Sequence, residues 1–317
     1  MNSSWKIAAI GECMLELSNP GGRPLERNMS LQFSFGGDTL NTAVYLARLG
    51  VECSYVTALG EDPYSAWMLH EWQQEGVDTS TVEIIPGRNP GLYMIQTDAA
   101  GERSFHYWRM QAAARELFAD EARAERVLQR MKQADLVYLS GITLSLYDDA
   151  SLQRLVSGLE EYRAAGGRVA FDGNYRPRGW SSAQQAREKF QRVLSLASLV
   201  LPTFDDEAGL YGDREPPETA QRLHDLGVSE VAVKHGAAGV LVSCNGEQQW
   251  VETTPVEQVV DSTAAGDSFN GAYLAARARG LDAATAAGWG NRLAGCVITH
   301  PGAIIPSGKM PQLETRT

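Results

Sequence analysis

The sequence predicts an α/β fold with a mostly parallel central sheet and helices on both of its faces. Short apolar runs with the length of buried strands occupy residues 6–11, 53–60, 135–141, 168–174, 199–203 and 230–236. Amphipathic segments with helical spacing lie between several of these runs, at residues 39–49, 64–75, 150–165 and 218–226. Strands that alternate with helices form parallel sheets, because a helix makes each crossover. No internal repeat and no long linker divides the sequence, so we expect a single domain over residues 1–317.

The composition argues against several classes of protein. The formal net charge of −11 would repel nucleic acid and anionic membranes. No apolar stretch approaches the roughly 18 residues that a membrane-spanning helix needs, and the N-terminal residues carry no signal-peptide pattern. The four cysteines lie far apart without a CxxC motif, and the five histidines form no close pair, so we expect no histidine-based metal site. Isolated thiols of this kind are typical of the reducing cytoplasm, where we expect the protein to be located.

Residues 90–110 interrupt the alternation and read as two strands around the turn DAAG. Alternate side chains of a strand share a face, which places Phe105, Tyr107 and Arg109 on one side and Ser104, His106 and Trp108 on the other. Aromatic residues on both faces favour a strand with a ligand on one side and a partner sheet on the other. The alternative is a strand buried on both faces within one core, which the cost of burying an unpaired Arg109 argues against.

The most informative stretch is DSTAAGDSFNGA at residues 261–272. The apolar spacing from Phe269 to Ala276 predicts an amphipathic helix. Backbone N–H groups at the start of a helix attract anions, and the small side chains of residues 264–266 allow an anion to approach them. Asp267 then has two interpretations. It is the cap of the helix, or it is a base that removes a proton from the group that attacks the anion.

Two further stretches with paired glycines are candidate binding loops. A Gly-Gly pair ends at Gly37, and Asp38 and Asn41 fall in the first turn of the helix that follows, where Asp38 could also be a plain N-cap. The stretch VKHGAAGVLV at residues 233–242 places a lysine and two glycines between two strands, which by itself is also typical of a tight turn. Neither GxxxxGKS/T nor GxGxxG occurs, which argues against a P-loop protein and a dinucleotide-dependent oxidoreductase.

The stretches GGDTLNTA and DSTAAGDSFNGA resemble the two signatures of the PfkB, or ribokinase-like, family of sugar kinases. Finer features resemble the 2-keto-3-deoxygluconate kinases of that family, and the match runs in order through nearly the whole sequence. These features are GECMLELS (11–18), GLYMIQTDAAGERSFHYWR (91–109), FDGNYRPRGW (171–180) and GAIIP (302–306). The resemblance implies a ribokinase-like fold with a small β-strand lid, whose strands lie within about residues 12–35 and 90–110.

The resemblance also implies an activity, the ATP-dependent phosphorylation of the terminal hydroxyl of 2-keto-3-deoxygluconate to 2-keto-3-deoxy-6-phosphogluconate. Backbone N–H groups of Ala264, Ala265 and Gly266 would then stabilise charge on the transferring γ-phosphoryl, and Asp267 would be the base. One alternative is fructokinase or ribokinase activity on the same fold. Another is a sugar-binding regulator without catalysis. The intact Ala-Ala-Gly-Asp run argues against the regulator, because a pure binder needs no base beside a phosphate site.

By the same resemblance, two sets of residues form the binding sites. The sugar-binding set consists of Gly37, Asp38, Thr39, Leu40, Asn41, Tyr93, Tyr107, Arg109 and Arg176. The nucleotide-binding set consists of Asn174, Lys234, Gly236, Gly239, Ala265 and Gly266. Arg109 and Tyr107 share a strand face and could converge on the carboxylate of a sugar acid. A neutral sugar would leave this arginine desolvated without a partner, so the sequence favours the sugar acid.

One departure from the family pattern concerns the metal. Many members carry Asn-x-x-Glu where this sequence has PTFDDEAGLYG, with Thr203 at the usual Asn position and Asp206 and Glu207 competing for the acidic position. Because ATP phosphates need charge neutralisation, we expect Mg²⁺ assisted by one of these carboxylates through water. Asp261 and Thr263 match the start of a loop that holds a monovalent cation such as K⁺ in some members, and the sequence leaves that site open here.

The lid also bears on assembly. In some relatives the lid is held between the substrate and a second subunit, which fits the aromatic residues on both faces of residues 104–109. We therefore expect a homodimer formed through the lid, or a larger assembly built from such a dimer.

Overall fold

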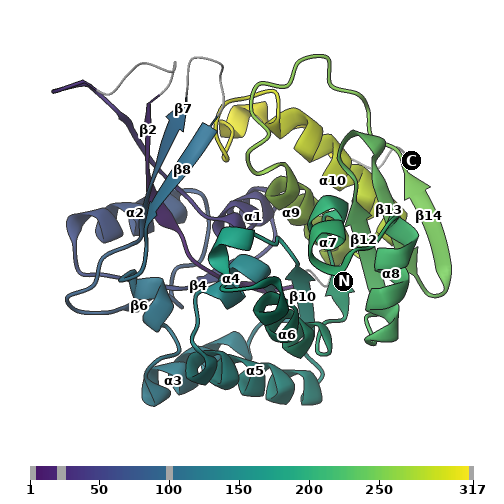
Figure 1. Cartoon of the computed structure of the whole chain (residues 1–317), viewed down its shortest axis with the longest axis horizontal. Helices are drawn as coiled ribbons and strands as arrows, with labels where there is room; N and C mark the ends of the chain where they lie inside the picture. The colour runs from purple at the N-terminus through teal and green to yellow at the C-terminus, as the bar shows by residue number, and fades with distance from the viewer. Residues whose placement is uncertain (1–4, 20–25, 98–102, 314–317) are drawn as a thin grey trace.

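The large sheet has the predicted α/β arrangement. The structure is a computed structural model, and it describes residues 5–19, 26–97 and 103–313 (Figure 1). From one edge to the other, the strands are β14 (Glu247–Val251), β13 (Val240–Cys244), β12 (Glu230–Lys234), β11 (Leu199–Val200), β10 (Arg168–Asp172), β9 (Leu136–Ser140), β1 (Ile7–Ile10) and β4 (Cys53–Val56). The strands from β12 to β4 run parallel, and β13 and β14 pair antiparallel at one edge.

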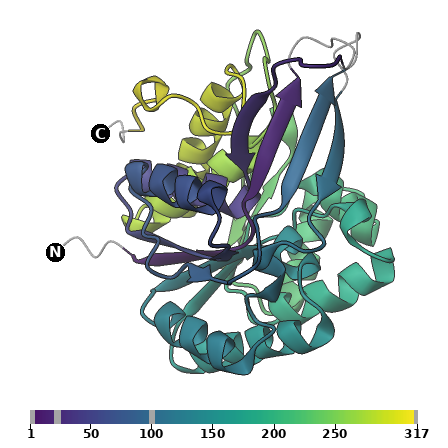
Figure 2. The ribbon, with the colours of Figure 1, turned by 90° about the vertical axis from the view of Figure 1, so that its left-hand side faces the viewer.

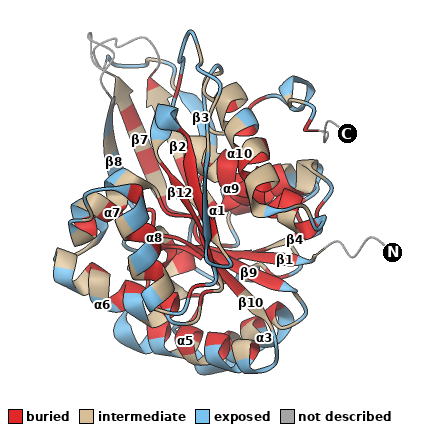
Figure 3. Ribbon diagram, turned by 90° about the vertical axis from the view of Figure 1, so that its right-hand side faces the viewer, coloured by how far each residue is buried: buried red, intermediate tan, exposed pale blue. Residues whose placement is uncertain are grey.

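Two layers of helices cover the faces of this sheet. One layer consists of α1 (Asp38–Arg48), α2 (Pro63–Gln74), α9 (Ala265–Ala278) and α10 (Ala283–Val297). The other consists of α3 (Glu121–Met131), α4 (Gly141–Ser145), α5 (Asp149–Ala164), α6 (Ala183–Leu194), α7 (Phe204–Tyr211) and α8 (Pro216–Asp225). Ile7 and Ala9 pack in the first core, whereas Ala8 and Ile10 pack in the second. The central strands are therefore buried on both faces (Figure 3), which is why they read as continuous apolar runs.

A second, smaller sheet forms the expected lid. Its strands, in order, are β3 (Gln32–Gly36), β2 (Met14–Asn19), β7 (Leu92–Thr97) and β8 (Arg103–Trp108). β2 and β7 pair parallel, and the other two pairs are antiparallel. Because β2 follows closely on β1, this sheet projects from the end of the large sheet at which the parallel strands finish (Figures 1 and 2). The turn DAAG between β7 and β8 lies outside the described residues.

Residues 53–60 form two strands where the sequence predicts one. β4 pairs with β1 as far as Val56, and β5 (Ala58–Leu59) then pairs with β6 (Glu83–Ile84) in a separate two-stranded sheet. The carbonyl oxygen of Thr57 accepts a hydrogen bond from Glu83 N at 3.0 Å, a distance typical of backbone hydrogen bonds. The apolar run continues through this change of partner, so hydrophobicity alone does not reveal it.

Candidate active site

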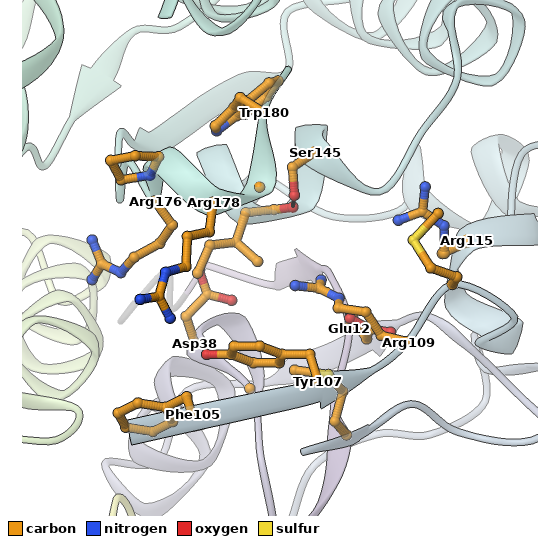
Figure 4. Close-up of a pocket in the computed structure, with 16 residues that line it drawn as sticks. Glu12, Asp38, Phe105, Tyr107, Arg109, Arg115, Ser145, Arg176, Arg178 and Trp180 are labelled. Carbon is orange, nitrogen blue, oxygen red and sulfur yellow. Dashed lines mark hydrogen bonds and ion pairs between the residues drawn. The ribbon is translucent and has the colours of Figure 1, made fainter. Parts of the chain in front are cut away.

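A cavity of about 680 Å³ lies between the lid and the carboxyl end of the large sheet (Figure 4). The lid contributes Phe105, Tyr107 and Arg109 to its lining. The opposite wall is the segment 176–180, which follows β10, and Glu12 and Asp38 contribute from the ends of β1 and the start of α1. Ligands of open parallel sheets bind at this edge, because the loops that follow the strands converge there.

The start of α9 offers backbone donors for an anion. Ala264 is the N-cap residue and has a left-handed backbone conformation with φ of 59°, which costs a non-glycine residue about 1–2 kcal/mol. Strain of this kind persists only where the surrounding structure enforces it. The Ala265 N–H donates to Ser262 O at 3.3 Å, whereas the N–H groups of Ala264 and Gly266 form no hydrogen bond with a described residue. These two donors lie at the positive end of the helix dipole.

Asp267 lies in the first turn of α9 and is half-buried. Its Oδ2 accepts a hydrogen bond from Asn41 Nδ2 of α1 at 2.8 Å. Burial and the charge of Asp38 raise the pKa of Asp267 to about 7, and the Asn41 hydrogen bond and the Lys234 charge oppose this rise. The interpretation of Asp267 as the helix cap is wrong, because Ala264 is the N-cap residue and the carboxylate bonds to another helix. A carboxylate that changes protonation near neutral pH is suited to general-base chemistry.

The first turn of α1 brings sugar-binding candidates to the cavity. Gly37 is the N-cap residue, and a Cβ at this position would overlap the backbone oxygen of Glu12, so the close approach of the two segments requires glycine. Asp38 lines the cavity and is not the N-cap residue. Its Oδ2 accepts a hydrogen bond from Asn174 Nδ2 at 2.7 Å, and burial raises the pKa of Asp38.

Three side chains of the predicted sugar-binding set point elsewhere. Leu40 and Thr39 are fully buried, and the Thr39 hydroxyl lies 3.3 Å from the hydroxyl of Tyr55. Tyr93 is also buried, and its hydroxyl donates a hydrogen bond to Glu16. None of the three lines the cavity. Asn41 reaches the site through its hydrogen bond to Asp267.

The two faces of β8 have different surroundings. Phe105, Tyr107 and Arg109 line the cavity, whereas Trp108 is 60% exposed on the opposite face. The alternative of a strand buried on both faces is therefore wrong. Arg109 is not unpaired either, because its Nη2 lies 2.5 Å from Oε2 of the buried Glu12. A carboxylate of the protein thus compensates the charge of this arginine, which weakens the sequence argument that Arg109 requires a substrate carboxylate.

A buried polar network lies between the large sheet and α9. Lys234 Nζ donates to Asp172 Oδ2 at 3.2 Å and to Asn270 Oδ1 at 3.0 Å. Asn270 Nδ2 also donates to Asp172 Oδ2, at 2.7 Å. A Cβ at Gly266 would lie 3.5 Å from Lys234 Nζ, so the ammonium group lies next to the start of α9. Lys234, predicted to bind the nucleotide, therefore lies buried beside the anion site.

The remaining nucleotide-binding candidates lie in two places. The loop of Gly236 and Gly239 has φ angles of 52° and 111° at these glycines, and a Cβ at Gly239 would overlap the Val251 carbonyl oxygen. This loop is thus the tight turn that the sequence also allows. Asn174 has φ of 35°, and its side-chain amide donates a hydrogen bond to Asp38, which lines the cavity.

The two candidate metal-assisting carboxylates differ in their partners. Glu207 Oε2 lies 2.6 Å from Arg222 Nη2, and burial raises the pKa of Glu207 to about 7. Asp206 Oδ2 lies 3.1 Å from Nη1 of Arg176, which lines the cavity. Within residues 5–19, 26–97 and 103–313, no group of three or more His, Cys, Asp or Glu side chains is placed to hold a metal ion.

Asp261 is buried and joins two distant segments. Its Oδ1 accepts a hydrogen bond from Thr263 N at 3.0 Å, and its Oδ2 accepts one from Gly302 N at 2.9 Å. The loop before α9 is therefore tied to the segment GAIIP near the C-terminal end of the sequence.

Several residues at the site were not identified from the sequence. Glu12, Arg178 and Asp172 fall within stretches that carry the family resemblance, and Asn270 lies in the second signature, so pattern matching could have marked them. Arg115 also lines the cavity. It follows three alanines and belongs to no recognised motif, so no sequence pattern indicated a role for it.

Comparisons with known proteins agree with the sequence resemblance. A 2-dehydro-3-deoxygluconokinase of Dickeya dadantii is 45% identical over 312 residues, which cover 96% of this chain and 98% of the relative. A 2-dehydro-3-deoxygluconokinase of Escherichia coli K12 is 44% identical and covers 97% of this chain and 99% of the relative. The crystal structure of a putative ribokinase II of E. coli in complex with ATP and Mg²⁺ superposes with a TM-score of 0.84 at 25% identity, covering 98% of this chain and 96% of that chain.

The match to a family model covers nearly all of the described residues. The model of the pfkB family carbohydrate kinases matches residues 5–310, a range that includes the large sheet, the lid and the start of α9. The fold, the two signatures and the relatives thus point to the same family. The chain belongs to the pfkB family of carbohydrate kinases.

Proposed function

We propose that the protein transfers the γ-phosphoryl group of ATP to the terminal hydroxyl of 2-keto-3-deoxygluconate, also called 2-dehydro-3-deoxygluconate. The observation that carries the chemistry is the Asp267 carboxylate, with a pKa raised to about 7, beside the free N–H groups at the start of α9. The names of the relatives at 44–45% identity support the choice of substrate. The product is 2-keto-3-deoxy-6-phosphogluconate.

Each residue of the proposed site has a defined part in the transfer. Asp38, beside Asn174, binds a sugar hydroxyl, and Asp267 accepts the proton of the terminal hydroxyl as its oxygen attacks phosphorus. The N–H groups of Ala264 and Gly266 stabilise negative charge on the transferring group. The ammonium group of Lys234, which lies next to Gly266, adds a fixed positive charge to this anion site. Asn41 holds the Asp267 carboxylate in place.

The nucleotide enters as its Mg²⁺ complex, as in the E. coli relative whose structure contains ATP and Mg²⁺. Of the two candidate acids, Asp206 is the better placed to assist the metal through water, because Glu207 is buried against Arg222. Gly236 and Gly239 form the turn next to the nucleotide. Charge neutralisation by Mg²⁺ makes the γ-phosphoryl accessible to an oxygen nucleophile.

A monovalent cation near Asp261 and Thr263 and a cytoplasmic location complete the proposal. Activity in K⁺ compared with an equal concentration of tetramethylammonium tests the cation, and equal rates would exclude it. The cysteines are all free thiols, as expected in a reducing compartment. Among the described residues, no helix has the length and apolar character needed to cross a membrane.

A panel of substrates tests the proposed function. Initial rates with 2-keto-3-deoxygluconate, fructose and ribose should give at least about a tenfold higher kcat/KM for the sugar acid, the size expected for one charge-assisted contact. Equal phosphorylation of fructose would favour the fructokinase alternative. ATP hydrolysis that no sugar stimulates, together with tight sugar binding, would favour the regulator.

A further inference from the structure

One end of the sugar cavity carries a buried glutamate and two arginines. Glu12 is 3% exposed and follows β1, Arg109 follows β8, and Arg115 lies in a short 3₁₀ helix, η1 (Ala113–Glu116). All three line the cavity. Figure 4 shows Arg109 and Arg115 on the same side as Glu12, with Asp38 across the cavity from Arg115.

The charges at this end do not cancel. Glu12 and Arg109 form an ion pair at 2.5 Å, which is neutral as a unit. Glu116, the neighbour of Arg115 in the sequence, pairs instead with Arg88 at 2.6 Å. The guanidinium of Arg115 forms no ion pair or hydrogen bond with any residue that the structure describes. One uncompensated positive charge therefore faces the cavity.

The backbone holds Arg115 in a fixed position. The flanking alanines of η1 are buried, and Ala113 N donates to Asn89 O at 3.0 Å. Leu117 and Phe118, which follow directly, are fully buried in the core. A half-buried guanidinium on such a rigid segment can bind an anion with little loss of backbone entropy.

Two buried polar atoms in this part of the structure also lack hydrogen-bond partners. The buried Tyr147 hydroxyl and Arg109 Nε have no hydrogen-bond partner among the described residues. Burial raises the pKa of Tyr147, the charge of Glu12 raises it further, and the charge of Arg115 lowers it. Buried donors are costly when unsatisfied, so this end of the cavity is suited to a polar anionic group.

We propose that Arg115 binds the carboxylate of the substrate, while Glu12 holds Arg109 beside it as a neutral positioning pair. This inference rests on the proposed function and assigns the recognition of the sugar acid to a particular residue. The reacting hydroxyl and the carboxylate are at opposite ends of the six-carbon chain. Asp38, near Asp267, and Arg115 likewise lie across the cavity from each other (Figure 4). A carboxylate at Arg115 would bring the charge of this end to zero.

The other arginines of the cavity are less suited to this role. Arg176 is paired with Asp206 at 3.1 Å. Arg178 is exposed, and water therefore satisfies much of its charge. Arg178→Ala removes the same charge from the same cavity as Arg115→Ala, and so it is the matched comparison.

Steady-state kinetics of Arg115→Ala, Arg115→Lys and Arg178→Ala test the inference. For Arg115→Ala we expect KM for 2-keto-3-deoxygluconate to rise about tenfold or more, as for loss of a hydrogen bond to a charged group. KM for ATP and the melting temperature should stay near wild type, and kcat should change less than KM. Arg115→Lys should retain part of the affinity, because the charge remains without the planar fork. Arg178→Ala should raise KM for the sugar acid much less than Arg115→Ala.

Kinetics with fructose distinguish a failure of the Arg115 assignment from a failure of the proposed function. Loss of Arg115 should leave KM for this neutral sugar nearly unchanged, since it has no carboxylate. If wild type prefers the sugar acid and Arg115→Ala keeps KM within threefold, the assignment of Arg115 is overturned and the proposed function stands. An equal effect of Arg178→Ala also overturns the assignment, because it indicates a general effect of cavity charge. Wild-type enzyme that prefers fructose overturns both.

Discussion

The side-chain amide of Asn41 donates a hydrogen bond of 2.8 Å to the carboxylate of Asp267, across 226 residues of sequence. This contact joins the start of α1 to the start of α9, and each of these helices begins in one of the two family signatures. Asp38, in the same turn as Asn41, bonds to Asn174 beyond β10. The proposed sugar side and the proposed phosphate side are therefore connected through side chains of two helix starts.

Asp267→Asn should separate binding from chemistry. The amide has nearly the same size and can still contact Asn41, so the fold, sugar binding and ATP binding should be retained. Without a base, kcat should fall about 10²- to 10⁴-fold. Calorimetric titration with each substrate and a rate assay check the two halves of this expectation. Turnover within threefold of wild type would show that Asp267 has only a structural role.

The pH dependence of kcat/KM should report the protonation of Asp267. A base must be unprotonated, and the pKa of Asp267 is raised to about 7. The rate should therefore increase with pH up to a midpoint of about 7 and then level off. Asp38, Asp172, Lys234 and Asn41 act on this carboxylate; the two aspartates oppose its ionised form, whereas the Lys234 charge and the Asn41 hydrogen bond favour it. A profile that is flat from pH 5.5 to 8.5 would contradict the assignment.

Asn41→Ala should shift this midpoint to higher pH. The Asn41 hydrogen bond stabilises the ionised carboxylate, so its loss raises the pKa of Asp267 further. The rate at pH 6 should then decrease more than the rate at pH 8.5. Asn291→Ala is the control, because among the described residues this amide donates hydrogen bonds only to the backbone oxygens of Val251 and Glu252. A uniform loss of rate at all pH values would indicate a purely structural effect.

The fold was largely predictable from the sequence, because buried parallel strands are short and continuously apolar. The runs at 6–11, 135–141 and 230–236 became β1, β9 and β12 with ends shifted by a few residues at most. The break at Thr57 was not predictable, since it depends on a pairing with Glu83 in a distant segment. A hydrophobic pattern predicts that a strand is buried, but it does not predict which other strand pairs with it.

The site was predictable where a backbone requirement limits the residue type, as at Gly37, where a Cβ would overlap Glu12. It was less predictable where the role depends on a partner. Arg109 was expected to have no partner within the protein, and its partner Glu12 follows β1, far away in the sequence. Arg115 carried no signal, because only the tertiary structure brings it to the cavity. Sequence spacing gives the face of an element but not the charges opposite it.

Lys234→Met should destabilise the fold as well as slow the reaction. The change leaves Asp172 buried with amide donors but no counter-ion, and the loss of one partner of a buried ion pair costs about 3–5 kcal/mol. Urea unfolding followed by circular dichroism measures this free energy. Lys309→Met, at an exposed lysine, is the control and should change stability by less than about 0.5 kcal/mol. A difference between the two variants below about 1 kcal/mol would contradict the assignment of Lys234 and Asp172 as a buried ion pair.

The outer face of the lid should form the contact between subunits. Trp108 is 60% exposed on the edge strand β8. A large exposed apolar side chain next to an unpaired strand edge favours association with a second copy. We therefore expect a homodimer at micromolar concentration, or a larger assembly built from it.

Trp108→Glu should weaken this assembly, because it places a charge in the contact and removes a large apolar surface. The inner face of the same strand carries Phe105 and Tyr107, so a lid without its partner should hold the sugar less firmly and raise KM for the sugar. Ile84→Glu, at a 45% exposed position on β6, makes the same kind of change away from the lid and should affect neither property. Sedimentation velocity and sugar kinetics measure the two effects together. Wild-type protein that sediments as a fully active monomer would exclude assembly through the lid, since the inner face would then be positioned without help from a second subunit.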